Sequence, residues 1–317
     1  MRVLLVKTSS LGDVIHNLPV ASDLARHRPG IVIDWVVEAP FADIPALHPA
    51  VATIHKVALR RWKKSPFARD TRAAIRAFKA GLADTRYDLV LDTQGLIKSA
   101  WVARQAHGPR AGYDRHSIRE PLAALAYDRR YAVDRALHAV DRNRRLAAAA
   151  FGYNLDDLPL DYGLSGLAGA PAGGAPEAIL LTATSRDDKL WAEDRWVELG
   201  RRLAAQGMAC VLPSGSAIER ERAERLAAQI PQAIALPPAS IRALATRIAA
   251  ARCAVGVDTG LTHLACATGI PTVALYTATD PGLTGVVGAG FFRNLGGKNA
   301  SPGVDAVTAA LAEAGVR

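Results

Sequence analysis

A carboxylate follows a small, hydroxyl-rich turn close to the start of the chain, in the stretch KTSSLGDVIH that contains Asp13. An apolar segment, RVLLVK, precedes this turn, and a helix is expected to begin within it. In one interpretation Ser9 or Ser10 caps the helix, and Asp13 complements the helix dipole in the first turn. In the other, Asp13 is a general base at a strand-to-helix turn, where ligands bind in open α/β sheets. Taken alone, the stretch favours the capping interpretation.

A second strand-to-helix turn in the stretch CAVGVDTGLTHL presents Asp258, Thr259, Gly260 and His263. Glycine at the bend allows a ligand to approach the backbone, and the N–H groups of the first helical turn suit a pyrophosphate. Asp258 could then accept hydrogen bonds from sugar hydroxyls, and His263 lies one turn into the helix. The structural alternative is that Asp258 caps the helix and His263 is an ordinary polar residue.

Two further strand ends carry polar residues. The loop TSRDDKLW offers Thr184, Ser185 and Lys189, which could bind phosphate oxygens, although it could also be a capped helix entrance with a surface lysine. The turn PSGSAIERE offers Glu219, a carboxylate that could hold a ribose diol. Because the carboxyl ends of parallel strands share one edge, these loops and the Asp258 turn are expected to converge on one ligand.

Several common chemistries lack support in this sequence. No G-x-G-x-x-G follows the first apolar segment, no G-x-x-x-x-G-K-[ST] occurs, and no His/Asp cluster has metal-ligand spacing. Cys210, Cys253 and Cys266 show no C-x-x-C spacing and are expected to be small buried hydrophobic residues. The remaining interpretation has two ligands. A nucleotide diphosphate binds to the second half of the chain and an anionic ligand to the first half, with Asp13 between them.

The elements that position these residues alternate between strands and helices, which predicts an α/β fold with parallel sheets. The alternation stops at residues 165–178, a Gly, Pro and Ala-rich linker, and then restarts. We therefore expect two doubly wound domains, residues 1–164 and 179–317, facing each other across a cleft; the last helix either stays with the second domain or packs back on the first. The predicted strands include 2–7, 32–38, 87–92, 178–184, 208–213, 253–258 and 272–276, and the predicted helices include 191–207, 218–230 and one that begins near 261.

The net charge of +9 is concentrated in the first half of the chain, where residues 1–175 carry +8 and residues 176–317 carry +1. Between residues 56 and 79 there are nine basic residues and one acidic residue. Such a block could bind phosphates, an acidic membrane surface or nucleic acid, or could simply be a solvated helix face. Apolar runs are too short to span a bilayer, and no signal peptide is evident, so we expect a cytoplasmic protein.

Together these segments resemble the ADP-heptose heptosyltransferases of lipopolysaccharide inner-core assembly, and most closely the members that add the first heptose. The similarity runs nearly end to end, and its specificity lies in the ensemble of segments rather than in one motif. The pair KTSSLGD and RRW discriminates best, because members that add the second heptose carry a different first turn. The matching segments are 7–19, 33–38, 60–64, 91–100, 119–123, 184–191 and 257–264.

The resemblance implies the GT-B fold, with two Rossmann-like domains, and assigns roles to the donor-side residues. Asp13 matches the proposed catalytic base, and Glu219 matches the residue at the adenosine ribose. Where a methionine is expected against the adenine, this chain has Ala239. The implied contacts to the diphosphate are Thr184, Ser185 and Lys189, and those to heptose and phosphate are Asp258, Thr259, Gly260 and His263.

The implied reaction is an inverting displacement that needs neither a metal nor a cofactor, in which Lys189 stabilises the departing ADP. The implied acceptor is Kdo2-lipid A, at the cytoplasmic face of the inner membrane. Nucleic acid is not an implied partner, and the sequence indicates no oligomeric state. The implied acceptor-binding residues are Arg60, Arg61, Lys63, Lys64, Gln94, Lys98 and Arg119.

Three alternatives compete with this interpretation. The first is a related glycosyltransferase that adds the second heptose or uses another nucleotide sugar or acceptor. The second is a sugar-nucleotide epimerase on the same scaffold, which would not need a basic first domain. The third is a non-enzymatic binder of anionic lipid or nucleic acid, for which Trp62 within RRWKK is the best argument.

Overall fold

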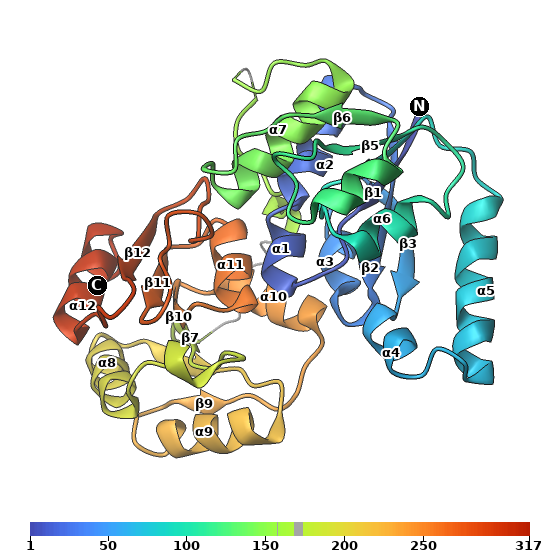
Figure 1. Ribbon diagram of the computed structural model, residues 1–317. Coiled ribbons are helices and arrows are strands. Elements are labelled where there is room, and N and C mark those ends of the chain that lie inside the picture. The colour runs from blue at the N-terminus through green and yellow to red at the C-terminus, as the bar shows by residue number, and fades with distance from the viewer. Residues whose placement is uncertain (157, 168–173) are drawn as a thin grey trace. The chain divides into compact units, whose positions relative to one another are not determined.

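The computed structural model describes residues 1–156, 158–167 and 174–317. The chain forms two compact units, Met1–Gly163 and Leu164–Arg317, each with one parallel six-stranded sheet covered by helices (Figure 1). The first sheet has the order β3-β2-β1-β4-β5-β6 and the second β12-β11-β10-β7-β8-β9. Counted within its own unit, each order is 3-2-1-4-5-6, the order of doubly wound dinucleotide-binding folds. The predicted α/β class and Rossmann-like architecture of each unit are therefore confirmed.

The first unit contains the predicted strands around a fully buried centre. Strand β1 reads RVLLV, and its Val3, Leu4, Leu5 and Val6 have no exposed surface, as expected for a strand covered on both faces. The elements are β1 (Arg2–Val6), α1 (Leu11–Ile15), α2 (Leu18–His27), β2 (Val32–Glu38), η1 (Ala39–Phe41), α3 (Asp43–Ala46), β3 (Val51–Val57), α4 (Leu59–Lys64), α5 (Arg69–Ala83), β4 (Leu89–Asp92), α6 (Ile97–Ala103), β5 (Arg110–Tyr113), η2 (Pro121–Ala126), β6 (Arg129–Tyr131) and α7 (Ala139–Phe151).

The second unit repeats the same plan. Its elements are η3 (Ser165–Leu167), β7 (Glu177–Leu181), η4 (Asp187–Lys189), α8 (Glu193–Ala205), β8 (Ala209–Leu212), α9 (Ala217–Ala227), β9 (Ile234–Ala235), α10 (Ile241–Ala250), β10 (Cys253–Val257), α11 (Gly260–Ala267), β11 (Thr272–Tyr276), β12 (Phe292–Gly296) and α12 (Val304–Glu313). Strands β10 and β7 are neighbours in this sheet, as β1 and β4 are in the first. At these pairs the strand order reverses, which is where ligands bind in folds of this kind.

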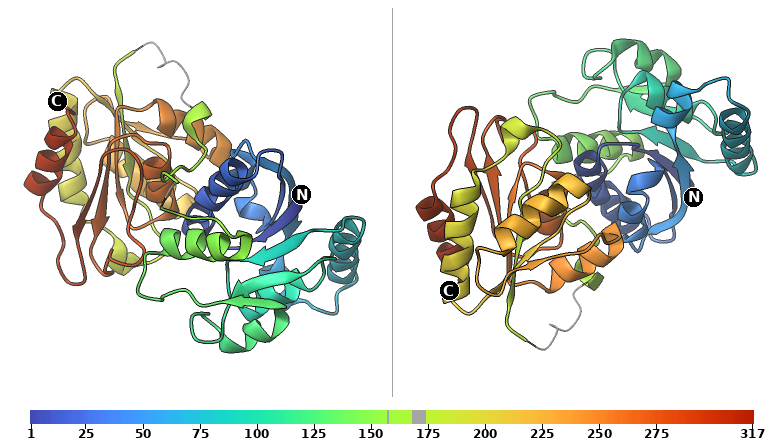
Figure 2. Two further views of the ribbon diagram at one scale, coloured as in Figure 1. Left: turned by 90° about the horizontal axis from the view of Figure 1, so that it is seen from above. Right: turned by 90° about the horizontal axis from the view of Figure 1, so that it is seen from below.

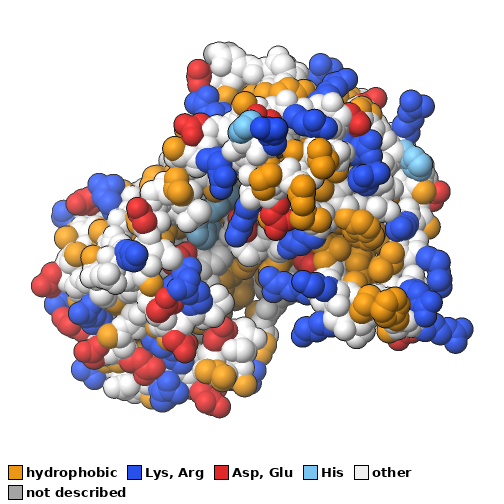
Figure 3. Space-filling model, viewed as in Figure 1, with side chains coloured by type: hydrophobic (Ala, Val, Ile, Leu, Met, Phe, Trp, Pro, Cys, Tyr) orange, Lys and Arg blue, Asp and Glu red, His pale blue; other side chains and the backbone are white. Residues whose placement is uncertain are grey.

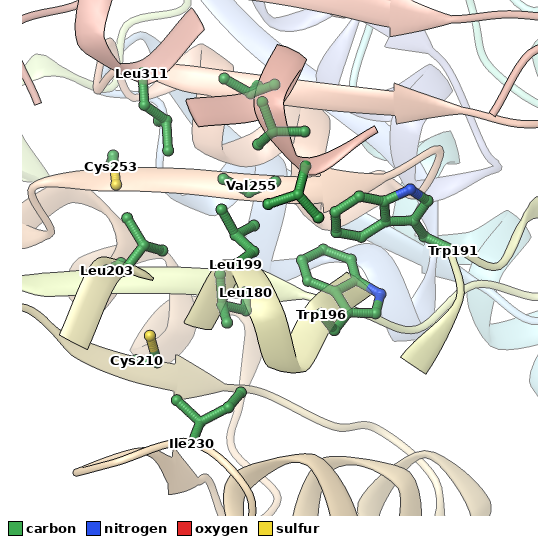
Figure 4. Close-up of a cluster of buried hydrophobic side chains, with 14 of the residues drawn as sticks. Leu180, Trp191, Trp196, Leu199, Leu203, Cys210, Ile230, Cys253, Val255 and Leu311 are labelled. Atoms are coloured by element: carbon green, nitrogen blue, oxygen red, sulfur yellow. The ribbon is translucent and has the colours of Figure 1, made fainter. Parts of the chain in front are cut away.

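A buried cluster on one face of the second sheet holds α8 and α12 against the strands (Figure 4). Trp191 and Trp196 meet edge to face, with ring centroids 4.9 Å apart. Cys210 and Cys253 lie in the same cluster, and burial raises the pKa of the Cys210 thiol to about 11. All three cysteines are buried and free, so the prediction that they act as small hydrophobic residues is confirmed.

The structure changes the predicted linker, residues 165–178, at both of its ends. Residues 177 and 178 of the predicted linker belong to β7, because Ala178 is buried and pairs with Cys210 and Cys253 on the neighbouring strands. Residues 165–167 form a short 3-10 helix, and residues 168–173 of the linker lie outside the described residues.

The last helix, α12, packs on α8 and β11 of its own unit (Figure 2). Val307 and Leu311 contribute to the buried cluster of that unit. Among the described residues, no helix combines the length and the apolar character needed to cross a membrane.

Candidate active site

The polar side chains at the carboxyl edge of the second sheet meet around Asp258, which directly follows β10. Its Oδ2 accepts hydrogen bonds from Lys189 Nζ at 2.7 Å and from Thr279 Oγ1 at 2.8 Å. His263 Nε2 lies 4.0 Å from Oδ1. The Lys189 and Asp258 side chains are only 18% and 16% exposed, so water screens their attraction less than it would at an open surface. Three loops therefore bring a cation, a carboxylate and a hydroxyl together.

The loop after β7 is fastened to this cluster by Thr184, whose Oγ1 donates to the backbone oxygen of Asp258 at 3.0 Å. Lys189 ends the short helix η4 of the same loop. Ser185 and Arg186 are exposed, and Arg186 is held by an ion pair with Asp188. The predicted convergence of Thr184 and Lys189 on the Asp258 turn is thus present, while Ser185 forms no hydrogen bond with that turn among the described residues.

The helix α11 begins at this edge in a geometry that suits an anion. Thr259 is the N-cap residue and has an extended conformation. Its side chain accepts no hydrogen bond from the N–H groups of the first turn, so it does not compete with an anion for them. Gly256 lets the helix approach the sheet, because a Cβ there would lie 2.2 Å from Thr262 Oγ1. Gly260 is the first helical residue, and His263 is buried one turn later.

Glu219 lies in the first turn of α9, after β8, and serves as a helix cap. Its Oε2 accepts hydrogen bonds from the backbone N–H groups of Gly215 at 2.7 Å and Ser216 at 3.0 Å. The ribose contact that the resemblance implies remains a prediction. Ala239 is exposed in the loop before α10, where its small side chain fills little space.

The first unit presents Asp13 in the first turn of α1, where its carboxylate binds the N-cap residue Ser10, while the Ser10 side chain forms no hydrogen bond that caps the helix. Asp13 Oδ2 accepts hydrogen bonds from Ser10 N at 2.7 Å and Ser10 Oγ at 3.0 Å. The other carboxylate oxygen, Oδ1, has no hydrogen-bond partner among the described residues. Since a carboxylate has about four acceptor positions, capping leaves Asp13 able to accept a proton.

Two of the predicted acceptor-binding residues hold the turn before α1. Gln94 is buried, and its Oε1 accepts hydrogen bonds from Thr8 N at 3.0 Å and Ser9 N at 3.2 Å. Lys98 Nζ donates to Ser9 Oγ at 2.8 Å. Both residues were expected to bind the acceptor, whereas their role in holding this turn was not predicted. Arg119 is exposed.

Sequence reasoning does not single out Lys7, which the structure places beneath the same turn. Its Nζ donates to Thr93 O at 2.8 Å and Asn143 Oδ1 at 3.3 Å. Burial lowers the pKa of Lys7, while the nearby charges of Asp13 and Asp92 act in the opposite direction. A lysine directly after a fully buried strand is the signal that could have found it. Thr279 is a second such omission, from the loop after β11.

The basic helix α4 separates its charged and aromatic residues. Arg60, Arg61, Lys63 and Lys64 are exposed, and their binding of the acceptor stays a prediction. Trp62 is only 6% exposed and packs against Phe78 and Trp101, with ring centroids 5.9 and 6.5 Å away. The stacking role that supported a nucleic-acid binder is therefore wrong, because the indole lies inside the hydrophobic core.

Comparison with known families identifies one family model along most of the chain. The model for glycosyltransferase family 9 (heptosyltransferase) matches residues 75–309. This range includes the loops around Lys189, Glu219 and Asp258 and excludes the turn around Asp13.

Curated relatives extend the similarity to the first unit. The chain is 51% identical to lipopolysaccharide heptosyltransferase 1 of Pseudomonas aeruginosa, over 91% of this chain and 82% of the relative. It is 45% identical to the enzyme of the same name from Escherichia coli K12, over 91% of both chains.

Solved structures show the same similarity in three dimensions. The E. coli heptosyltransferase WaaC with ADP has a TM-score of 0.94 and 42% identity, over 99% of this chain and 100% of that one. The structure of WaaC with ADP-2-deoxy-2-fluoro heptose has a TM-score of 0.91 and 40% identity, over 99% of both. E. coli ADP-heptose lps heptosyltransferase II, at 20% identity and a TM-score of 0.76 over 99% of both chains, shares the fold.

Proposed function

This chain belongs to glycosyltransferase family 9, the heptosyltransferases, and on that premise we propose that it transfers L-glycero-D-manno-heptose from ADP-heptose to the first Kdo of Kdo2-lipid A. It is a heptosyltransferase, and the names of its relatives support a role in synthesis of the lipopolysaccharide inner core. Two observations favour addition of the first heptose over addition of the second. They are the common name of the relatives and the presence of the KTSSLGD and RRW segments.

The donor is assigned to residues 179–317, and the observation that carries the proposal is the cluster around Asp258. Lys189 and Thr184 lie where a diphosphate bound at the N-terminus of α11 would find a cation and a hydroxyl. In the donor complex Lys189 would exchange its ion pair with Asp258 for one with the phosphates. Asp258 would then be free to accept hydrogen bonds from heptose hydroxyls.

The acceptor is assigned to residues 1–164, joined to the donor-binding part by residues 165–178. The cations of α4, with Lys98 and Arg119, would bind the phosphates and Kdo carboxylates. This assignment places the enzyme at the cytoplasmic face of the inner membrane, where its lipid acceptor is exposed to the cytoplasm.

The proposed reaction is a single displacement with inversion at the anomeric carbon. The Kdo hydroxyl attacks that carbon and gives its proton to Asp13, while the bond to the diphosphate oxygen breaks and its electron pair leaves with ADP. Lys189, the hydroxyls of Thr184 and Ser185, and the N–H groups of α11 stabilise the negative charge on the departing diphosphate. Because this chain's own groups supply that stabilisation, we propose a metal-independent reaction.

The direct test is incubation of the protein with ADP-heptose and deacylated Kdo2-lipid A, followed by mass spectrometry of the acceptor. The expected result is a mass gain of one heptose. Transfer only to an acceptor that already carries one heptose would identify an enzyme that adds the second. Transfer from another nucleotide sugar in competition would reject ADP-heptose as the donor.

A further inference from the structure

Three large aliphatic side chains are exposed together on the first unit. Ile97, at the start of α6, is 53% exposed, and Leu122 and Leu125, in η2, are 69% and 72% exposed. The elements η2 and α6 pack against each other. Glu120, just before η2, accepts a hydrogen bond from Ile97 N at 2.6 Å and donates from its own N to Gly95 O at 3.2 Å. The three side chains thus sit on a fixed platform, and a fixed, exposed apolar group indicates an interaction surface.

Cations border this platform on two sides. Arg119 directly precedes Glu120, and Lys98 directly follows Ile97. The buried Glu38 lies between Lys98 and α4. The backbone of Arg60 donates a hydrogen bond to the Glu38 carboxylate. Burial raises the pKa of Glu38, and the charges of Lys98 and Arg60 oppose this shift because both lie close to the carboxylate. Figure 3 shows hydrophobic side chains gathered over α6, with Lys and Arg side chains bordering them near α4.

The carboxylate of Glu38 offsets part of the charge of Lys98 and Arg60, but the cations outnumber it. In the described part of the chain, Arg119 and the four cations of α4 form no ion pair. The carboxylate of Glu120 accepts a hydrogen bond from the Ile97 amide, which does not remove its negative charge, so Glu120 offsets part of the charge of Arg119 beside it in the chain. The surface therefore combines aliphatic side chains with a positive field, and a second copy of the same surface would be repelled by it.

We propose that this docking face, formed by Ile97, Leu122 and Leu125 and bordered by the cations of α4 and by Arg119, binds the surface of a bilayer that contains anionic phospholipid. Aliphatic side chains enter the boundary between headgroups and acyl chains, and the cations contact the headgroups. Nucleic acid fits less well, because bases stack on aromatic rings and the indole of Trp62 is buried. The proposal extends the proposed function, in which the acceptor is a membrane lipid, but bilayer binding itself requires neither donor nor acceptor.

The test is co-sedimentation of the purified protein with vesicles of phosphatidylglycerol and of phosphatidylcholine, with no sugar substrate present. We expect binding to phosphatidylglycerol that weakens with added salt, and weaker binding to phosphatidylcholine. The double variant Leu122→Ser/Leu125→Ser should lower the partition coefficient about tenfold or more, because it removes two aliphatic groups from the membrane boundary. Ile218→Ser is the matched control, since Ile218 is 80% exposed but lies on α9 of the second unit; its binding should equal that of the unchanged protein.

Unchanged binding by the Leu122/Leu125 variant, with an unchanged melting temperature, would overturn the proposal, as would equal loss in the Ile218→Ser control. A dimer seen by sedimentation velocity that dissociates in the double variant would instead assign the face to a second copy.

Transfer to the deacylated acceptor in solution separates the docking proposal from the proposed function. The double variant should keep the kcat and KM of the unchanged protein there, whereas absence of transfer by the unchanged protein would reject the proposed function and leave the vesicle result standing.

Discussion

Asp13 and Asp258 each follow a central strand at the switch point of a Rossmann-like sheet, but they are held differently. Asp13 receives its hydrogen bonds from Ser10 of its own turn. Asp258 receives them from Lys189 and Thr279, which belong to two other loops. The hydrogen bonds to Asp13 leave one of its carboxylate oxygens open to accept a proton. Asp258 instead forms an ion pair with Lys189, a cation that could bind a diphosphate in its place. The two turns thus differ in where the hydrogen-bond donors to the carboxylate come from, and we infer from this difference that the two carboxylates have different roles in the proposed reaction.

The largest expected effect is that of Asp13→Asn on turnover. The amide oxygen can still accept the Ser10 hydrogen bond, so folding should persist, but the side chain cannot take a proton. We expect kcat to fall by roughly 10²–10⁴, the usual contribution of a positioned base. Turnover close to that of the unchanged protein, with Asp13→Ala mainly lowering the melting temperature, would reduce Asp13 to a capping residue worth about 0.5–2 kcal/mol.

Removal of the cation beside Asp258 should have the next largest effect. Lys189→Ala leaves the partly shielded carboxylate without its ion pair and removes a charged donor to the diphosphate. We expect the KM for ADP-heptose to rise by about 10- to 100-fold, as for the loss of a hydrogen bond to a charged group. Arg186→Ala, three residues away in an exposed pair with Asp188, is the matched control and should change this KM little.

A smaller effect is expected on the acceptor side, where the cations are exposed. Added NaCl should raise the acceptor KM by a few-fold, because salt screens exposed charges beyond about 8–10 Å, while the donor KM should change less. Arg60→Gln/Arg61→Gln should flatten this salt dependence and leave that of the donor unaltered. Equal salt sensitivity for both substrates would make residues 56–79 an ordinary solvated face.

The smallest effect on turnover is expected at His48, a buried residue of the first unit that touches neither proposed ligand. Its Nδ1 accepts from Ala50 N at 3.1 Å and its Nε2 contacts Ser22 Oγ at 2.8 Å, so the ring is held neutral. Burial lowers the pKa of His48 to about 4, against 6.5 for an unperturbed histidine. Because the unfolded chain binds the proton more readily, stability is fully present above pH 6.5 and is lost as the pH falls towards 4.

That loss should approach about 3 kcal/mol, at 1.36 kcal/mol for each pH unit between the two pKa values. Urea unfolding at pH 7 and pH 4.5 measures it, and His48→Asn should show a smaller difference between the two pH values. An identical difference in the variant would assign the acid sensitivity to other groups.

The sequence was sufficient to predict the central strands, since buried parallel strands such as RVLLV and CAVGV carry uninterrupted apolar runs. It was also sufficient to place Thr184, Lys189 and Asp258 at one sheet edge. The edge strands β9 and β12 were not predicted, because β9 has only two residues and FRNLG in β12 is half exposed and carries no apolar run.

Side-chain partners from distant loops could not be predicted in the same way. The contact between Thr279 and Asp258 depends on how two loops fold back, and no spacing in the sequence records it. The burial of Trp62 among exposed cations depends likewise on Phe78 and Trp101 from α5 and α6. Local pattern identifies the element, whereas tertiary packing decides which of its faces is covered.

The central claim is that Lys189 serves donor binding and Asp13 serves the chemical step, and calorimetric titration of ADP-heptose into the two single variants tests it most directly. We expect Asp13→Asn to bind ADP-heptose as tightly as the unchanged protein, although it turns over slowly, and Lys189→Ala to bind it about 10- to 100-fold more weakly. Donor affinity that is unaffected by Lys189→Ala, or that falls as far in Asp13→Asn, would contradict this division of roles.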